Sequence, residues 1–271
     1  MQIHSTASIH QSAIIENSAQ IGANCKIGPF CYVGKGVKIF DNVNLISHVS
    51  IFGNTKIGES TKIWPFASVG HDPQDLKFAG EKTKLVIGKN NKIRESVSIN
   101  SGTEGGGGIT RIGDNCLFML GSHVAHDCQI GNNVVVANNG SIGGHVVIED
   151  NVTIGGLSGV HQFCRIGESA MIGAVSMVSK DVIPYGLVMG ERSSLTGVNV
   201  IGLKRRGFSN KQILELQKGF KFLFYGDGSL RDRAENIIKT ECGDLVAQLV
   251  SFILSDSSRK LTTPQMKHNQ S

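Results

Sequence analysis

Four histidines in the middle of the chain are the side chains best suited to acid–base chemistry: His123, His126, His145 and His161. An imidazole changes its charge near neutral pH, so it can act as a general base. In its neutral form it can also bind a transition metal. Either role requires the four rings, or some of them, to converge, and that depends on how the chain folds back on itself.

A repeat of six residues runs through most of the chain. Branched aliphatic residues occupy every sixth position from Ile3 to Val69, and the phase returns from Ile87 to Ile99. The repeat then restarts one residue out of step at Ile112 and continues to about Val178. A period of six fits neither an amphipathic helix nor a heptad. It is typical of a parallel β-helix built from hexapeptides.

Three hexapeptides make one triangular coil, with the aliphatic side chains pointing into the prism. Neighbouring coils stack at roughly the strand spacing of ~4.8 Å. A small residue usually follows four positions after each aliphatic one, and five of the six cysteines fall there: Cys25, Cys31, Cys116, Cys128 and Cys164. We interpret them as packing residues. There is no CxxC pair that would indicate a zinc or redox site.

The repeat predicts a mainly β chain with two domains. Residues 1–192 form the β-helix, and residues 193–271 form a small α-helical domain whose last segment, 255–271, is expected to be disordered. Amphipathic spacing predicts helices over 209–225, 229–240 and 242–254, the first with Ser209 as its cap.

Two interruptions of the repeat are expected to be loops. The segment between Val69 and Ile87 would place Asp75 and Glu81 at interior positions, and charged residues cannot fill a dry core. The second interruption is the glycine-rich segment 102–111. Loops on a rigid solenoid are natural places for function.

The unbroken register after Ile112 brings the histidines together. Residues 18 apart stack on adjacent coils, so Gly144 and Gln162 lie in the same column as His126. The other three histidines flank this column: His123, His145 and His161. The sequence therefore predicts one histidine-rich patch about three coils high.

The composition of this patch favours acyl transfer. His126 can take a proton from a hydroxyl as general base, and the backbone N–H of Gly144 can stabilise a developing oxyanion. Asp127 is a candidate to orient the imidazole, although successive strand residues point apart. A zinc enzyme of the γ-carbonic anhydrase type is the alternative. Its HxxxxH pair is absent here, where the spacing is HVAH, so we predict no metal.

Charge and hydropathy narrow the class of protein. The net charge of +5 is too small to indicate nucleic-acid binding, but it suits an acidic partner or a phosphate-bearing substrate. No window approaches 18 apolar residues, and the start of the chain lacks the order of a secretory signal. We expect a cytoplasmic protein without stable membrane insertion.

The sequence resembles the UDP-N-acetylglucosamine O-acyltransferase family of lipid A biosynthesis over nearly its whole length. The resemblance rests on the helical C-terminal region together with the motifs HDPQDLK (71–77), GSHVAHD (121–127), IGGHV (142–146), VHQF (160–163) and GVNVIGLKRRGFS (197–209).

The resemblance implies a left-handed β-helix and a homotrimer with sites between subunits. It implies transfer of an R-3-hydroxyacyl chain from the phosphopantetheine of acyl carrier protein to the 3-position of UDP-N-acetylglucosamine, without a bound cofactor. It gives His126 and Gly144 the catalytic roles. It assigns the binding of the UDP-sugar to Asp75, Gln74, Lys77, His123, His145, His161, Gln162, Asn199 and Arg205.

The family also sets acyl length with a residue that matches Ala174, and Met177 is a second candidate stop. Stacking of nearly three coils at ~4.8 Å predicts a chain of about 12–14 carbons. Two positions depart from the best-known members of the family. Those members have a glutamate at the position of Ile201 and a histidine at the position of Arg192, which leaves the nucleotide contacts open.

Three alternatives remain at this point. The same enzyme can acylate a 3-amino group of a UDP-2,3-diamino sugar. A related hexapeptide enzyme could use acetyl-CoA. The sister N-acyltransferase of the same pathway carries an extra N-terminal domain, and the repeat here begins at Ile3, which argues against that enzyme. An ice-binding solenoid would need a repeated outward residue such as threonine, and none repeats.

Overall fold

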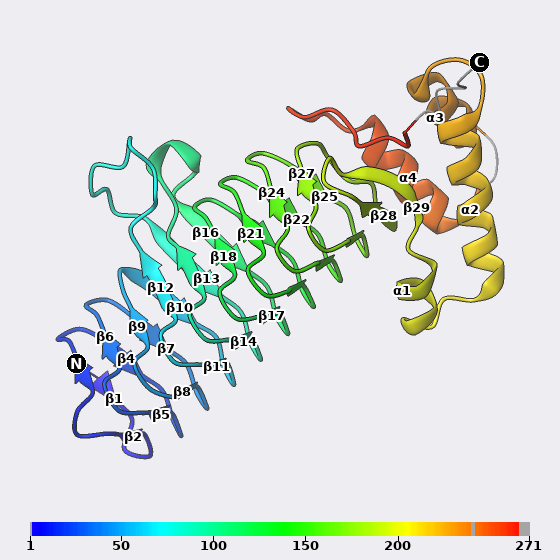
Figure 1. Ribbon diagram of the computed structural model, residues 1–271. Coiled ribbons are helices and arrows are strands. Elements are labelled where there is room, and N and C mark those ends of the chain that lie inside the picture. Colours follow the sequence, from blue (N-terminus) through cyan, green and yellow to red (C-terminus); the bar gives the residue numbers. More distant parts are fainter. Residues whose placement is uncertain (1, 240–241, 266–271) are drawn as a thin grey trace.

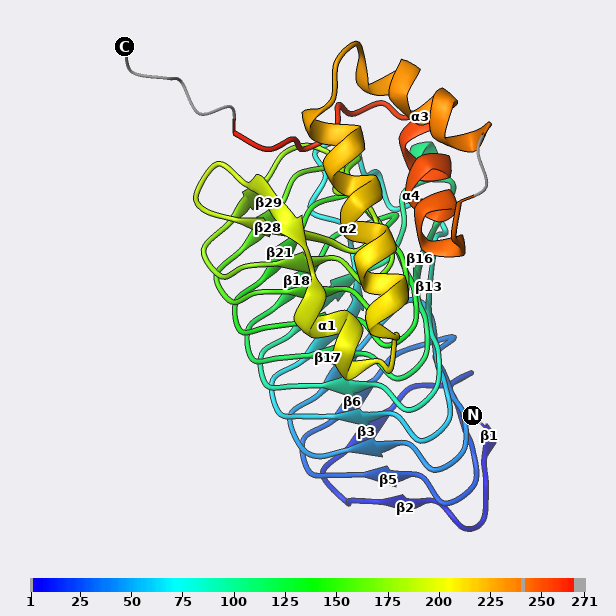
Figure 2. The ribbon, with the colours of Figure 1, turned by 90° about the vertical axis from the view of Figure 1, so that its right-hand side faces the viewer.

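The structure is a computed structural model that describes residues 2–239 and 242–265. Three parallel sheets form the faces of a long triangular prism, and four helices lie at one end of it (Figures 1 and 2). The chain visits the three faces in turn, so up to β27 each strand pairs with the strand three places before it or after it. The fold is the predicted left-handed parallel β-helix with a C-terminal helical region.

Sheet A consists of β1 (Gln2–Ile3), β4 (Gln20–Ile21), β7 (Lys38–Ile39), β10 (Asn54–Ile57), β13 (Lys84–Ile87), β16 (Ile109–Ile112), β19 (Gln129–Ile130), β22 (Val147–Ile148) and β25 (Arg165–Ile166). Sheet B consists of β2 (Ser8–Ile9), β5 (Lys26–Ile27), β8 (Asn44–Leu45), β11 (Lys62–Ile63), β14 (Lys92–Ile93), β17 (Leu117–Phe118), β20 (Val135–Val136), β23 (Thr153–Ile154), β26 (Met171–Ile172), β28 (Gly186–Met189) and β29 (Ser194–Val198). Sheet C consists of β3 (Ile14–Ile15), β6 (Tyr32–Val33), β9 (Ser50–Ile51), β12 (Ser68–His71), β15 (Ser98–Asn100), β18 (His123–Val124), β21 (Ser141–Ile142), β24 (Gly159–Val160) and β27 (Met177–Val178).

The core is one column of apolar side chains inside the prism. The second residue of each short strand points inward, because successive residues of a strand face opposite sides of the sheet. These residues are fully buried in the middle coils, as Ile57, Ile99 and Val136 show. The five cysteines predicted to be packing residues are buried, and burial raises the pKa of Cys116 to about 11.

The three corners of the prism differ in composition, and each contains residues with positive φ. Asparagine, which tolerates this left-handed conformation, recurs at the corner between sheets A and B, as at Asn90, Asn115 and Asn133. The corner between sheets B and C instead carries bulky residues: Phe30, His48, Phe66, Leu157 and Val175. We call these two the A–B corner and the B–C corner.

Both predicted loops leave the prism at the third corner, between sheets C and A. The first loop (72–83) connects β12 to β13, and the second (101–108) connects β15 to β16 and contains the 3₁₀ turn η1 (Glu104–Gly106). The loops hold each other, because Thr83 Oγ1 donates to Ser101 Oγ at 3.2 Å and Asn100 Nδ2 donates to the Asp72 carbonyl at 2.9 Å. The inference of a loop between Val69 and Ile87 is confirmed for residues 72–83, whereas residues 70–71 and 84–86 belong to β12 and β13.

The helical region follows an antiparallel hairpin that extends sheet B. The predicted boundary between residues 192 and 193 lies inside this β28–β29 hairpin, and the first helix starts at Val200. The helices are α1 (Val200–Arg205), α2 (Asn210–Tyr225), α3 (Leu230–Ile238) and α4 (Asp244–Leu254). Ser209 caps α2 through a capping box, as predicted, whereas none of the three helices predicted from the sequence covers α1.

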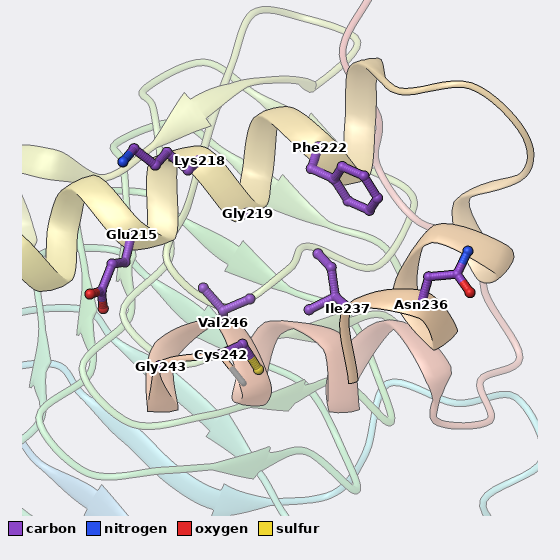
Figure 3. A pocket seen from close by; sticks show the side chains of 9 residues that line it. All are labelled: Glu215, Lys218, Gly219, Phe222, Asn236, Ile237, Cys242, Gly243 and Val246. Atoms are coloured by element: carbon purple, nitrogen blue, oxygen red, sulfur yellow. The ribbon is translucent and has the colours of Figure 1, made fainter. Parts of the chain in front are cut away.

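Helices α2 and α4 approach closely at Gly219, where an added Cβ would lie 3.1 Å from two Val246 carbons. Beside this contact is a cavity of about 530 Å³ between α2, α4 and the end of α3 (Figure 3). None of the histidines of the patch lines it. Within the described residues, no helix combines the length and the apolar character needed to cross a bilayer.

The expectation of disorder over 255–271 is wrong for the part that the structure describes. Residues 255–265 follow α4 back to the prism, where Leu261 forms a parallel bridge with Asp181. A polar composition with serine and threonine suggested disorder, but the segment gains backbone hydrogen bonds from the end of the prism. Residues 266–271 lie outside the described range.

Candidate active site

A cleft of about 320 Å³ lies on sheet C beside the corner that carries the two loops. Seven residues singled out in the sequence line it: Gln74, His123, His126, Gly144, His161, Gln162 and Met177. They come from the first loop and from four successive coils, so the register of 18 residues does gather them in one place.

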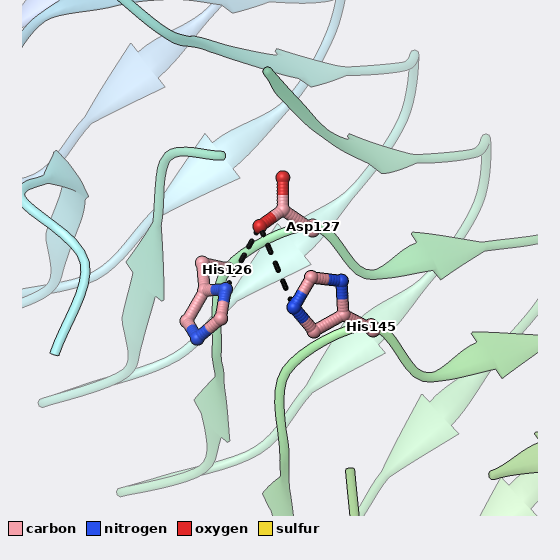
Figure 4. Close-up of side chains that lie close together, drawn as sticks. All are labelled: His126, Asp127 and His145. Atoms are coloured by element: carbon pink, nitrogen blue, oxygen red, sulfur yellow. Dashed lines mark hydrogen bonds and ion pairs between the residues drawn. The ribbon is translucent and has the colours of Figure 1, made fainter. Parts of the chain in front are cut away.

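His126, which lines the cleft, forms a buried pair with Asp127 (Figure 4). Their exposed fractions are only 6% and 4%, and His126 Nδ1 lies 2.8 Å from Asp127 Oδ2. Asp127 has a φ of 59°, which turns its carboxylate back towards the preceding residue. Because a carboxylate accepts, Nδ1 carries the proton and Nε2 is left with a free lone pair for a substrate proton.

Thr103, which sequence reasoning did not single out, fixes the Asp127 carboxylate. Its N–H donates to Asp127 Oδ1 at 2.9 Å, and its hydroxyl donates to Oδ2 at 2.6 Å. The hydroxyl also accepts a hydrogen bond from the Gly106 N–H, so its own proton is directed at Asp127. Thr110 Oγ1 accepts from the Asp127 N–H at 2.8 Å. The second loop therefore holds the orienting group of His126.

Gly144 lies directly against the His126 ring. A Cβ added there would lie 2.7 Å from His126 Cε1 and 2.8 Å from Nε2, so a side chain at this position would displace the imidazole. Within the described residues no acceptor is hydrogen-bonded to the Gly144 N–H. A free backbone donor beside a free imidazole nitrogen is the pair that a tetrahedral oxyanion requires.

His145 stands on the far side of Asp127. Its Nε2 lies 4.0 Å from Asp127 Oδ2, and its ring meets His126 edge-on with a centroid separation of 5.0 Å (Figure 4). Phe163 stacks on the other face of His145 at 4.4 Å. Burial lowers the pKa of His145, although Asp127 acts in the opposite direction. His145 is therefore neutral at physiological pH.

His123 lies on β18, three residues before His126. Its Nδ1 is 2.7 Å from the hydroxyl of Ser98 on the preceding coil. Burial lowers the pKa of His123, and the neighbouring His126 lowers it further. Like His145, it offers a ligand a neutral hydrogen-bonding group.

The first loop reaches the cleft with Gln74, which lines it, while Asp75 and Lys77 follow on the loop surface. Asp75 is half-buried, and its carboxylate accepts the Lys77 N–H at 3.0 Å, which shapes a tight turn. The charge of Asp75 acts on His145, where it raises the pKa slightly against the effect of burial. The loop acid is thus within electrostatic reach of the histidines.

Small residues line the cleft along sheet C, and Met177 lies at its end. His123, Ser141, Gly159 and Met177 stand on successive coils in one register. The Met177 side chain lies over Gly159, since an added Cβ there would lie 2.9 Å from the Met177 sulfur. Ala174 is exposed on the B–C side of the same coil and does not line this chain's cleft.

The residues predicted to meet the nucleotide lie around α1, outside the cleft. Asn199 caps this helix by accepting the Gly202 N–H at 3.0 Å, and its amide donates to the Ser169 carbonyl. Arg205 is exposed, whereas Arg206 pairs with Glu168 at 3.2 Å. The two departing positions, Arg192 and Ile201, are also exposed.

Among the residues that the structure describes, His126, Asp127 and His145 have ligand atoms that could meet on a metal, since these atoms lie within 4.8 Å of one another. However, His126 Nδ1 is at hydrogen-bond distance from Asp127 Oδ2, and Thr103 donates to both carboxylate oxygens. A zinc ligand needs a lone pair directed at an ion about 2 Å away. Here His126 Nδ1 carries a proton and Asp127 Oδ2 accepts from His126 and Thr103, which favours a hydrogen-bonded site.

Two family profiles match parts of the chain. One, described as Udp N-acetylglucosamine O-acyltransferase, Domain 2, matches residues 181–262. The other, the bacterial transferase hexapeptide of six repeats, matches residues 109–144.

Relatives that match over about three quarters of their length have similar descriptions. An acyl-[acyl-carrier-protein]–UDP-N-acetylglucosamine O-acyltransferase of Paracoccus denitrificans is 56% identical over 202 residues, which cover 74% of this chain and 77% of that protein. One from Nautilia profundicola is 45% identical over 71% of this chain and 74% of its own length. The solved UDP-N-acetylglucosamine acyltransferase of Campylobacter jejuni superposes with a TM-score of 0.90 at 39% identity, over 95% of this chain and 100% of that chain.

Proposed function

The chain belongs to the UDP-N-acetylglucosamine O-acyltransferase family, and we propose that His126 is the general base of its acyl transfer. The enzyme transfers an acyl chain from acyl carrier protein to UDP-N-acetylglucosamine, the first step of lipid A biosynthesis. The observation that carries the proposal is the buried pair of His126 and Asp127 against the free N–H of Gly144.

The reaction we propose is one direct transfer of an R-3-hydroxyacyl group. His126 Nε2 takes the proton of the sugar 3-hydroxyl while that oxygen attacks the thioester carbon. The Gly144 N–H stabilises the oxyanion of the tetrahedral intermediate. When the carbon–sulfur bond breaks, the imidazolium gives its proton to the departing phosphopantetheine thiol. Asp127, held by Thr103, keeps the base in the correct tautomer.

The substrates fill the cleft from two sides in this proposal. Gln74 and Asp75 on the first loop hold the sugar, with Lys77 beside them. The neutral rings of His123 and His145, together with His161 and Gln162, complete its hydrogen bonds. Asn199 and Arg205 bind the nucleotide, which places it near α1. The acyl chain follows the small residues of sheet C towards Met177. No metal or bound cofactor takes part.

A homotrimer is part of the proposal, and the B–C corner supports it. Phe30 and Phe66 are 62% and 64% exposed, and both have positive φ, which costs roughly 1 kcal/mol or more for an ordinary residue. Their rings sandwich His48 at centroid separations of 4.9 and 5.2 Å. Exposed aromatic rings on a strained backbone fit a surface covered by a second copy of the chain.

The test is transfer from 3-hydroxyacyl carrier protein to UDP-N-acetylglucosamine by the wild type and the His126→Ala variant. Loss of a general base lowers kcat by about 10²–10⁴-fold. The Asp227→Asn variant, on an exposed turn between α2 and α3, is the matched control and should keep full activity. A His126→Ala enzyme that retains a tenth of the wild-type kcat would rule out His126 as the base.

Two further arms of the assay separate the alternatives. A UDP sugar with a 3-amino group, offered beside UDP-N-acetylglucosamine, measures the preference for ester or amide formation. A chelator should leave the rate unchanged. Loss of activity that zinc restores would instead support a metal site at His126, Asp127 and His145.

A further inference from the structure

The segment that follows α4 forms a strap on the last coils of the prism, which we define as Ser257–Thr262 (Figure 1, red). The Asp181 N–H donates to the Lys260 carbonyl at 2.8 Å, and the Thr262 N–H donates to the Asp181 carbonyl at 2.7 Å. Ser257 Oγ donates to Asp181 Oδ2 at 2.6 Å. One prism residue therefore binds the strap near both of its ends.

Asp181 is a rigid anchor because it is fully buried and paired. Its carboxylate accepts from the Arg165 N–H and from Arg165 Nε, both at 2.8 Å. Removing one partner of a buried ion pair leaves an uncompensated charge, so this arrangement resists local opening. Arg165 also donates to Ser255 Oγ and stacks over Phe252, which ties the end of α4 to the same point.

The anchored strap places the Arg259 guanidinium at the rim of the cleft. Arg259 Nε donates to the Gln162 carbonyl at 3.1 Å, and Arg259 Nη2 lies 2.8 Å from His161 Nδ1. The Ser257 hydroxyl accepts the Arg259 N–H at 3.1 Å and so fixes the start of this side chain. His161 and Gln162 both line the cleft, although Arg259 is 98 residues from His161 in sequence.

The chemistry of this contact determines the state of His161. A guanidinium has five donors and no acceptor, so the nitrogen at 2.8 Å must accept. Nδ1 also lies 3.3 Å from the Gln162 carbonyl, and two acceptors this close would repel each other. Arg259 donates to both of them, which offsets this repulsion. With Nδ1 as the acceptor, the proton of the neutral ring is on Nε2, which no described residue engages.

We propose that Arg259 is a positioning residue that holds His161 as the Nε2–H tautomer, so that this ring presents a hydrogen-bond donor to the bound substrate. The proposal rests on the proposed function only in that His161 faces a substrate. The strap thus carries a polar group from the C-terminal region into the rim of a site otherwise built from the β-helix and its loops.

The test is ring ¹⁵N NMR of histidine-labelled protein above neutral pH, with His161 assigned from the signal missing in His161→Gln. In the wild type we expect the unprotonated signal for Nδ1 and the protonated signal for Nε2. Arg259→Ala should give a mixture of the two tautomers. Arg259→Lys, which can donate to one acceptor, should recover part of the wild-type state. Arg231→Ala removes an exposed arginine paired with Glu235 and is the control.

Steady-state kinetics complete the test. We expect Arg259→Ala to raise the KM of the UDP-sugar about 2-fold for an equal mixture of tautomers, because only the Nε2–H form offers the donor, with kcat changed less. A wild-type His161 protonated on Nδ1, or an Arg259→Ala variant with unchanged tautomers and KM, would overturn the proposal. If the wild type transfers no acyl chain, the proposed function fails while the tautomer measurement still decides the role of Arg259.

Discussion

At the scale of single residues, the site combines one imidazole oriented for catalysis with neighbours that are kept neutral. His126 is held by Asp127 and, through it, by Thr103. Burial lowers the pKa of both His123 and His145. A cleft lined by neutral rings can bind polar sugar groups without attracting anions. It also leaves proton transfer to His126 alone.

The lowered pKa values predict an acid-sensitive fold. Near and below the ordinary histidine pKa of about 6.5, His123 and His145 are protonated in the unfolded chain but not in the folded chain, so the unfolded state binds more protons. The free energy of unfolding should therefore fall as the pH drops through this value, and the loss should end below the folded pKa. We expect Tm to fall between pH 7.5 and 5.5, and the fall to be smaller in His123→Gln. Equal slopes for the two proteins would contradict this assignment.

At the scale of elements, periodicity decides what the sequence can reveal. The inward aliphatic column and the stack of His126, Gly144 and Gln162 were predicted because a six-residue period fixes which positions share a face. Thr103 and Arg259 were not, since they lie in segments without a period, and only their packing brings them to the site. The contact of His126 with Asp127 depends on a positive φ that the pattern does not encode.

The second loop should matter to catalysis through Thr103. Thr103→Val keeps the shape of the side chain but removes the donor to Asp127, so the carboxylate loses part of its orientation. We expect kcat to fall about 10-fold, as for one lost charge-assisted hydrogen bond, with KM nearly unchanged. Thr103→Ser restores the hydroxyl and should restore most of kcat. If valine and serine behave alike, Thr103 is only a packing residue.

Met177, at the end of the row of small residues on sheet C, should limit the length of the acyl chain. Met177→Ala opens the end of the cleft by about three heavy atoms, or roughly 4 Å of extended chain, and should shift preference from about 12–14 carbons to donors some two to four carbons longer. The measurement is competition among 3-hydroxyacyl carrier proteins of different length. Ala174→Met is the comparison, because Ala174 lies outside this chain's cleft. A shift in Ala174→Met alone would place the stop at the subunit interface.

At the scale of the whole molecule, each corner of the prism has a separate role. The A–B corner carries asparagines that suit its backbone, and the corner between sheets C and A carries the site and its loops. The B–C corner carries exposed aromatic and aliphatic residues in the same backbone conformation. This division leaves the B–C corner available to pack against a second copy of the chain.

Assembly can therefore be weakened without harming the coil. The double variant Phe30→Asn, Phe66→Asn replaces two strained aromatics with the residue that best tolerates positive φ. We expect light scattering to show dissociation of the trimer at micromolar concentration, with the β-rich circular dichroism spectrum retained. Ser60→Asn is the matched control, since Ser60 has a φ of 59° on the A–B corner of the same coil as Phe66. A double variant that stays trimeric would show that another face forms the interface.

Because each coil pairs only with its neighbours, the local stability of the coils should increase along the prism. The first coil is paired on one side within this chain, and its inward residues Ile3, Ile9 and Ile15 are only partly buried. The last coils are covered by the β28–β29 hairpin, the helices and the strap. In such a nearest-neighbour stack, opening begins at the less supported end and spreads inwards. Amide hydrogen exchange should thus slow progressively from β1 towards β25, so the coils that carry His126 and His161 stay closed while the other end frays.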